Sequence, residues 1–289
     1  MTNEIIVDVS KEQTRVALLE DRELVELYIE NPDNKGMVGN IYRGRVVSVL
    51  PGMEAAFVDI GYQKNAFLYV SDIIMQNKDE DIYQQDCEIT NKVPENVCIS
   101  DIIKEGQAID VQVIKEPIGT KGPRVTTHIT LPGRYLVLLP KANYIGISKR
   151  IENETEKLRL RNTVKAIKPE GMGLIIRTEA EGRNHSDITS ELSFLIKLWE
   201  KIESNNETTP FPRLVHRDLN LLARTIRDMF TCNIDKFLIN SSEQYTKTLE
   251  WIDMLSPSLK NRVEYFSKDC NIFDYYQIEK KISKALEKR

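Results

Sequence analysis

The sequence predicts a mixed α/β fold (α+β class) in which a small closed β-barrel is followed by helices. Three observations lead to this prediction. Short strand patterns fill the N-terminal segment, a second group of strands with glycine punctuation begins near Gly39, and apolar residues recur at helical spacing from Ile188 onward. Several short strands at regular spacing are typical of a small barrel.

The composition is that of an ordinary globular chain of 289 residues, 41% hydrophobic and 29% charged. We find no apolar run of membrane-spanning length and no basic leader before an apolar core, so we expect a cytoplasmic protein without a membrane-spanning segment. The four cysteines are scattered without a Cys-x-x-Cys pair, which argues against a structural zinc site and fits reduced thiols.

Charge is distributed unevenly although the net charge is only −4. Residues 112–150 contain seven basic residues and one acid, whereas residues 71–106 contain nine acids and three lysines. A solvated basic face is the simple interpretation of the first segment, and an anion-binding groove is the sharper one. Charge alone favours the simple interpretation.

The expected elements follow in order along the chain. Three N-terminal strands come from the stretches EIIVDVS, TRVALLE and ELVELYIE, and the turn-forming residues 31–36 come after them. The barrel strands are expected in NIYRGRVVSVLPG, EAAFVDIG, NAFLYVSDI and GQAIDVQVIKE. A long acidic insert at 72–105 interrupts them, which is unusual inside a compact barrel.

The second half alternates strands and helices before becoming helical. YLVLLP and GMGLIIRT predict buried strands, and TEKLRLRNTVKAI predicts a helix. The next helix is expected to have Ser186 or Asp187 as its N-cap. After a proline-bearing linker, three helices are expected in DLNLLARTIRDMF, EQYTKTLEWIDML and DYYQIEKKISKALEKR.

Two phenylalanines occupy the polar side of the hairpin predicted at residues 54–73. Side chains alternate across a strand, so Phe57 and Phe67 face away from the aliphatic side chains of their strands. OB-fold barrels bind single-stranded nucleic acid with outward aromatics that stack on bases and lysines that hold phosphates. Lys115 and Lys121 flank the end of a later strand. RNA binding is therefore favoured over the alternative that the rings pack beneath the acidic insert.

Several stretches resemble the ribonuclease E/G family, and the barrel is similar to the RNA-binding barrel of ribosomal protein S-one type. The resemblance is carried by GNIYRGRV, EAAFVDIG, GTKGPRVTTHITLPGRYLVLLP, GISKRI, PEGMGLIIRT and FLI near Phe237, in family order over nearly the whole chain. It implies a ribonuclease-H-like subdomain in two parts, at 1–37 and 214–289. An OB-fold barrel at 38–127 and a small α/β sensor subdomain at 128–213 are inserted between them.

The resemblance also implies a site that binds the monophosphate at the five-prime end of RNA. Arg177 and Thr178 would hold the phosphate, with help from the backbone of Val137 and from Lys149. A guanidinium fork and a hydroxyl at a strand end suit this task. Two residues depart from the family pattern. Family members usually have arginine in place of Lys149 and alanine in place of Glu179. The charge of Glu179 would repel a phosphate unless strand alternation turns its side chain away.

The catalytic residues of the family lie in a magnesium-binding nuclease domain, which we expect to follow this chain. The resemblance thus implies a metal-dependent endoribonuclease, homo-oligomeric at full length, of which this chain alone is inactive and needs no cofactor. One alternative is a non-catalytic RNA-binding adaptor. Another is an enzyme in which Asp8 binds metal, although we expect Asp8 to be a solvated aspartate at a strand end. The three histidines suggest no catalytic arrangement.

Overall fold

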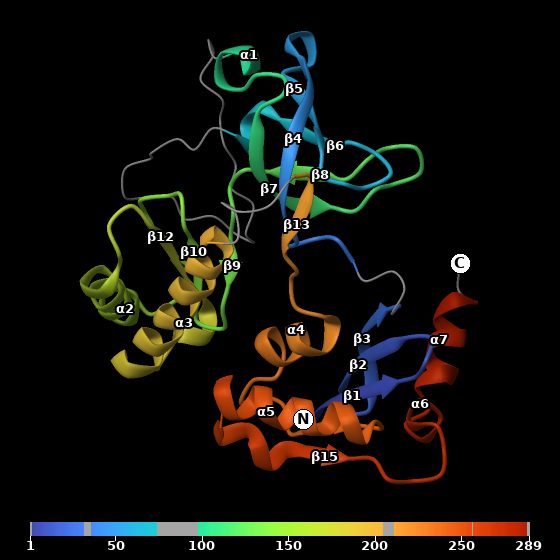
Figure 1. Cartoon of the computed structure of the whole chain (residues 1–289). Coiled ribbons are helices and arrows are strands. Elements are labelled where there is room, and N and C mark those ends of the chain that lie inside the picture. The colour runs from blue at the N-terminus through green and yellow to red at the C-terminus, as the bar shows by residue number, and fades with distance from the viewer. Residues whose placement is uncertain (1, 32–35, 74–97, 205–210, 256, 288–289) are drawn as a thin grey trace. The chain divides into compact units, whose positions relative to one another are not determined.

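The computed structural model describes residues 2–31, 36–73, 98–204, 211–255 and 257–287. The chain divides into two compact units (Figure 1). The first unit combines Met1–Gly36 with Leu219–Arg289, and the second comprises Met37–Asp218. Within the described part of the chain, no helix is long and apolar enough to cross a membrane.

The first unit is built on a five-stranded mixed sheet. Its strands, in spatial order, are β15 (Val263–Tyr265), β14 (Lys236–Ile239), β1 (Asn3–Val9), β2 (Thr14–Glu20) and β3 (Glu23–Glu30). Strand β2 is antiparallel to its neighbours β1 and β3, whereas β14 and β15 run parallel to β1. All three predicted N-terminal strands are therefore confirmed.

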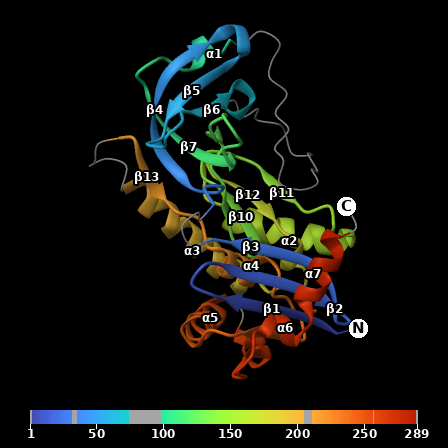
Figure 2. The same ribbon diagram turned by 90° about the vertical axis from the view of Figure 1, so that its right-hand side faces the viewer.

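Helices cover both faces of this sheet (Figure 2). Alternate residues of β1 divide between the faces: Ile5 and Val7 pack with α4 (Leu221–Asp228) and α5 (Ser242–Leu255), and Ile6 packs with α6 (Ile272–Tyr275) and α7 (Ile278–Leu286). The single helix expected at residues 274–289 is instead interrupted. Gln277 adopts a left-handed conformation with φ of 58°, which helical residues do not have.

The second unit contains a closed five-stranded barrel with an OB-like form. Its strands are β4 (Ile41–Leu50), β5 (Ala55–Asp59), β6 (Ala66–Tyr69), β7 (Ala108–Lys115) and β8 (Arg124–Thr126). They pair in the order β4-β5-β6-β8-β7, and β7 pairs back with β4 to close the barrel. The sequence did not predict β13 (Arg213–His216), which pairs with the first residues of β4, Ile41–Arg43.

The barrel core is filled by inward-pointing aliphatic residues of all five strands, including Val46, Val58, Leu68, Val113 and Val125. The acidic insert lies mostly outside the described residues. Its last part is described and forms the short helix α1 (Ile99–Ile102), whose Ile99 is buried in the barrel core. The insert is therefore anchored to the barrel at this end.

The rest of the second unit is a four-stranded sheet with two helices. The strand order is β11 (Ile145–Ile147), β12 (Gly173–Ile176), β10 (Leu136–Leu139) and β9 (Leu131–Pro132). Helices α2 (Glu154–Ile167) and α3 (His185–Ser204) share its core. The expected N-cap of α3 was wrong: the helix already begins at His185, and the Asn184 side chain accepts a hydrogen bond from the Asp187 amide at 2.8 Å.

Closure of the barrel depends on a close approach at Gly44 in β4. A Cβ atom there would lie 2.6 Å from Val58 Cγ1 and 2.7 Å from the Asp59 backbone oxygen. We predict that Gly44→Ala lowers the free energy of unfolding of the second unit by about 1–3 kcal/mol, because the neighbouring strand must shift. Urea unfolding, followed by Trp199 fluorescence in a Trp251→Phe background, measures this change.

Gly52→Ala is the matched control for this prediction. A Cβ atom at Gly52 meets nothing within 4 Å, so this variant should unfold at the wild-type midpoint. Equal midpoints for Gly44→Ala and Gly52→Ala would show that the barrel tolerates a side chain at Gly44.

Candidate nucleic-acid interface

Phe57 on β5 and Phe67 on β6 lie directly opposite each other. The next residues along the two strands, Val58 and Leu68, point into the barrel core, so both rings lie on the outside. The ring centroids are 6.0 Å apart with an interplanar angle of 69°, an edge-to-face arrangement typical of aromatic pairs. Both side chains are partly exposed, so a flat ligand can contact them.

Cationic residues continue this row across the barrel. Phe67 is opposite Arg124 on β8, and Arg124 is opposite Lys115 on β7. Val125 belongs to the core, so Arg124 points outward like the two rings. Lys115 is exposed. Sequence reasoning missed Arg124, because the pairing of β6 with β8 joins strands that the acidic insert separates in the chain.

Arg124 is oriented by Asp72. Its Nε and Nη2 atoms donate hydrogen bonds to Asp72 Oδ2 at 3.0 and 2.8 Å. The arginine side chain is 38% exposed, and a pair at such a position contributes little to stability. The pair therefore holds a guanidinium beside the aromatic rings at the barrel surface.

Lys121 lies in the loop between β7 and β8 and is exposed. Lys64 Nζ donates a hydrogen bond to the Gly119 backbone oxygen at 2.5 Å, which ties this loop to the β5–β6 turn. A Cβ atom at Gly122 would lie only 2.0 Å from the Asn65 backbone oxygen, so glycine is required for this contact. The loop therefore brings Lys121 next to the hairpin that carries the phenylalanines.

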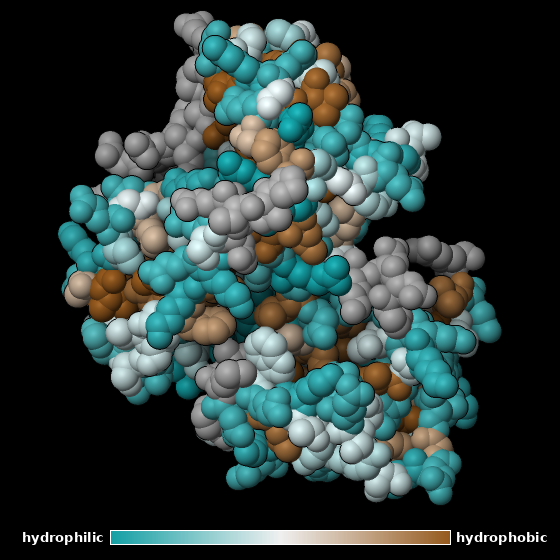
Figure 3. Space-filling view, in the orientation of Figure 1, coloured by the Kyte–Doolittle hydropathy of each residue, from teal (hydrophilic) through white to brown (hydrophobic). Residues whose placement is uncertain are grey.

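Other apolar side chains are exposed on the barrel segment, namely Val38, Val47, Met53, Tyr62, Tyr69 and Ile118. On the face shown in Figure 3, apolar residues are interspersed with polar ones over the upper part of the picture. Tyr69 alternates with Leu68 on β6, so it lies on the same outer side as Phe67. The aromatic surface of this strand is thus larger than the predicted pair.

Arg177 and Thr178 lie at the end of the smaller sheet. Arg177 follows β12, and Thr178 begins the 3-10 turn η3 (Thr178–Ala180). Arg177 Nη1 donates to the Gly133 backbone oxygen at 2.6 Å, and the Arg177 amide donates to the Tyr135 oxygen at 2.8 Å. The hydroxyl oxygens of Thr178 and Ser148 are 3.0 Å apart.

Lys149 reaches the same end of the sheet, because β11 runs parallel to β12. The Ser148 amide donates to the Ile176 oxygen at 2.8 Å, and exposed Lys149 follows directly. Val137 lies on β10 between β9 and β12, and its side chain is 5% exposed. The phosphate-binding roles of these residues stay predictions.

Glu179 lies in η3 and not on the strand, so the expected strand alternation does not decide its direction. The charge of Glu179 acts on Arg134, which is 1% exposed. Burial lowers the pKa of Arg134, and the charges of Glu179 and Glu191 oppose that effect. Glu179 thus lies within electrostatic range of a buried arginine.

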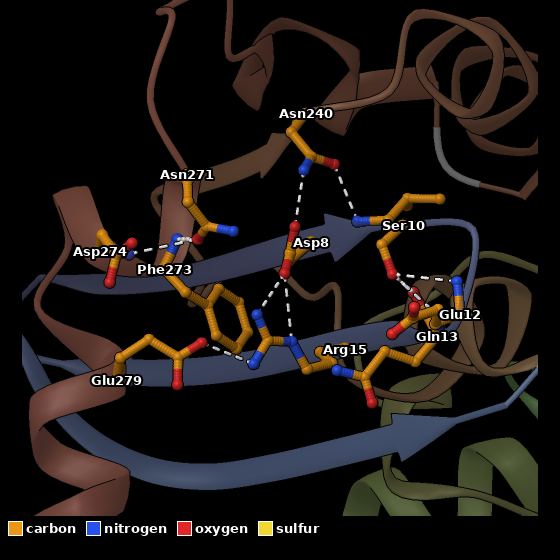
Figure 4. Close-up of polar contacts among 11 residues, drawn as sticks. Asp8, Ser10, Glu12, Gln13, Arg15, Asn240, Asn271, Phe273, Asp274 and Glu279 are labelled. Carbon is orange, nitrogen blue, oxygen red and sulfur yellow. Dashed lines mark hydrogen bonds and ion pairs between the residues drawn. The ribbon is translucent and has the colours of Figure 1, made fainter.

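Asp8 is part of a buried polar network in the first unit (Figure 4). Its Oδ2 accepts hydrogen bonds from Nε and Nη2 of Arg15 at 3.1 and 2.5 Å, and its Oδ1 accepts one from Asn240 Nδ2 at 2.7 Å. Arg15 also donates to Glu279 Oε1 at 2.6 Å, and its guanidinium lies 4.3 Å from the centroid of the Phe273 ring. The network links the sheet to helices α6 and α7.

The expectation of a solvated aspartate at position 8 was therefore wrong. Asp8 is 4% exposed and both of its oxygens have protein partners. Among the described residues, no group of three or more histidine, cysteine, aspartate or glutamate side chains is placed to hold a metal ion. Asp8 is thus paired within the fold of this unit, and the described residues give no support to the alternative in which Asp8 binds metal.

The three histidines lie in separate places. His128 is buried with its Nε2 3.3 Å from the Ser71 oxygen, His185 begins α3, and His216 ends β13. Burial lowers the pKa of both His128 and His216, so the neutral form is favoured in the fold.

The fold and the candidate surface define a two-unit protein with an OB-like barrel and an aromatic–cationic outer row. The family model "Ribonuclease E/G family" matches residues 130–289, more than half of the chain. The chain is 40% identical over 293 residues to Ribonuclease G of Salmonella typhimurium, covering 100% of this chain and 58% of that protein. It is 35% identical over 290 residues to Ribonuclease E of Haemophilus influenzae, covering 100% of this chain and 30% of that protein.

This chain belongs to the ribonuclease E/G family. It is also 40% identical over 286 residues to Ribonuclease G of Haemophilus influenzae, of which it covers 57%. The chain thus spans less than two thirds of the length of these relatives.

We predict that Asp8→Ala lowers the free energy of unfolding of the first unit by about 3–5 kcal/mol, because it leaves the charge of Arg15 without its buried partner. Trp251 fluorescence during urea unfolding, in a Trp199→Phe background, measures the change. The matched control is Asp253→Ala, since Asp253 pairs with Lys260 at the surface, where both side chains are nearly half exposed. Equal midpoints for the two variants would contradict the structural role of Asp8.

Proposed function

We propose that this chain recognises single-stranded RNA as part of an endoribonuclease of the ribonuclease E/G type, acting in RNA processing and decay. One observation carries the proposal: a pair of partly exposed phenylalanines lies outside a closed barrel, in register with Arg124 and Lys115. Membership of the family supplies the class of ligand, and the row supplies a surface of suitable chemistry.

On this surface the rings of Phe57 and Phe67 stack on successive bases, and stacking of this kind contributes roughly 1–3 kcal/mol per base. The cations Lys115, Lys121 and Arg124 hold the backbone phosphates. Stacking tolerates any base, because every base has an aromatic face. The proposed surface therefore binds unpaired RNA with little sequence preference.

At the end of the smaller sheet, Arg177, Thr178 and Lys149 hold the five-prime monophosphate. An arginine fork, a hydroxyl and an ammonium group together supply directional donors and positive charge for a phosphate. The Gly133 oxygen fixes one guanidinium nitrogen of Arg177 and so orients the fork. This site gives the chain a preference for RNA ends that carry a monophosphate over those that carry a hydroxyl.

This chain spans 58% of the Ribonuclease G relative from Salmonella typhimurium. We therefore propose hydrolysis of RNA for the whole protein and not for this chain by itself. Magnesium would there supply Lewis-acid chemistry on the phosphodiester. The described residues contain no group of three or more suitable ligands, so none of them is assigned to hold the metal. The fold of the first unit is a separate point. Its strand order, β3-β2-β1-β14-β15, supports a ribonuclease-H-like assignment for this unit.

We predict that the double variant Phe57→Ala/Phe67→Ala weakens binding of a short single-stranded RNA at least tenfold, whichever group its five-prime end carries. Fluorescence anisotropy with a monophosphate RNA and a hydroxyl RNA of one sequence measures this. Phe194→Ala is the matched control, because Phe194 is an exposed phenylalanine of the same unit on α3. If the double variant binds as tightly as Phe194→Ala, the barrel surface is not the RNA site.

In the same assay, Arg177→Ala is expected to remove the preference for the monophosphate end and to leave affinity for the hydroxyl RNA unchanged. Arg217→Ala, at an exposed arginine of the same unit, should keep the preference. A wild-type chain that binds both ends equally would disprove the sensor while leaving the barrel proposal standing.

We predict that Arg124→Ala reduces the slope of log affinity against log salt by about 0.7, the value for one phosphate contact on a single strand. The double variant Asp72→Asn/Arg124→Ala should give the same slope, since it also removes the carboxylate that Arg124→Ala leaves without its partner. Titrations between low and moderate salt provide the slopes. An unchanged slope in both variants would exclude Arg124 from the phosphate contacts.

A further inference from the structure

The turn at residues 133–136, between β9 and β10, is held by one carboxylate from α3. Glu191 Oε1 accepts a hydrogen bond from the Arg134 amide at 2.6 Å. Glu191 Oε2 accepts hydrogen bonds from the amides of Tyr135 and Leu136, both at 2.8 Å. Three successive backbone N–H groups therefore point at a single side chain, which fixes the conformation of the turn.

Gly133 connects this carboxylate to Arg177. A Cβ atom at Gly133 would lie 2.7 Å from Glu191 Cδ, so the turn packs directly against the carboxylate. On the other side, the Gly133 oxygen accepts the hydrogen bond from Arg177 Nη1 at 2.6 Å. Tyr135, whose amide is held by Glu191, accepts the hydrogen bond from the Arg177 amide. These two hydrogen bonds of Arg177 therefore end on the turn that Glu191 holds.

Charge also acts across this turn. Burial raises the pKa of Glu191, while the three N–H groups and the charge of Arg177 act in the opposite direction. The carboxylate and the guanidinium thus attract each other across the turn. A neutral side chain at position 191 would lose this attraction, and an amide there would set at least one donor against the backbone N–H groups.

We propose that Glu191 is a positioning residue for five-prime phosphate recognition: it holds the 133–136 turn, and the turn sets the direction of the Arg177 guanidinium. This inference rests on the proposed function of Arg177. Glu191 itself would not touch the RNA. Its effect on binding passes entirely through Arg177, and this feature separates it from a general contribution to folding.

The test combines Glu191→Gln with Arg177→Ala in a double-mutant cycle, with Glu200→Gln on the exposed side of α3 as the matched control. Anisotropy with monophosphate and hydroxyl RNAs gives the preference of each variant. Amide hydrogen exchange over residues 133–137 and 174–178, measured without RNA, reports on the turn and on Arg177 independently of binding.

Glu191→Gln is expected to reduce the monophosphate preference by about tenfold, the effect of one charge-assisted hydrogen bond, without changing affinity for the hydroxyl RNA. In the Arg177→Ala background, Glu191→Gln should not change the affinity for either RNA. In the otherwise wild-type chain, Glu191→Gln should raise amide hydrogen exchange over both segments. A monophosphate preference that survives Glu191→Gln, or an equal loss of affinity for the monophosphate and hydroxyl RNAs, would overturn the inference. If the wild type itself shows no preference, the proposed sensor fails, and unchanged exchange at 174–178 would then also reject Glu191 as the residue that holds Arg177.

Discussion

Strand β4 pairs with β5 along one edge and with β7 along the other, and this double pairing closes the barrel. Gly44 makes the closure possible by letting β5 approach. Because side chains alternate along each strand, the register of these pairings decides which residues fill the core and which face outward. A slip of one residue would bury Phe57 and expose Val58. The proposed RNA surface is thus a direct consequence of the register of the barrel.

The outward position of Phe57 and Phe67 could be predicted from the sequence, because alternation within a strand is a local property. The position of Arg124 could not, since it depends on the pairing of β6 with β8 across the acidic insert. Asp8 shows the same limit. Its strand was predicted, but its partner Asn240 and the second partner of Arg15, Glu279, are remote in the sequence and converge only in the fold.

The two proposed binding regions of the second unit differ in how they are built. The barrel presents its aromatic and cationic side chains from regular strands, which suits contact with bases and backbone of any sequence. The smaller sheet presents Arg177 and Thr178 where β12 ends, and a turn and a helix hold the arginine in place. A terminal phosphate needs directional donors, so a rigid support matters more there. The family resemblance indicated Arg177, but the sequence offered no signal for its support.

The most direct test of the account is to map where RNA lies on the chain. A short RNA with a five-prime monophosphate and 5-iodouridine at internal positions is cross-linked by light, and the modified residues are identified by mass spectrometry. Stacking on the barrel predicts cross-links at Phe57 or Phe67, and these should disappear when unlabelled single-stranded RNA competes. Cross-links confined to residues 2–31 and 219–287 would place RNA on the other unit and contradict the central claim.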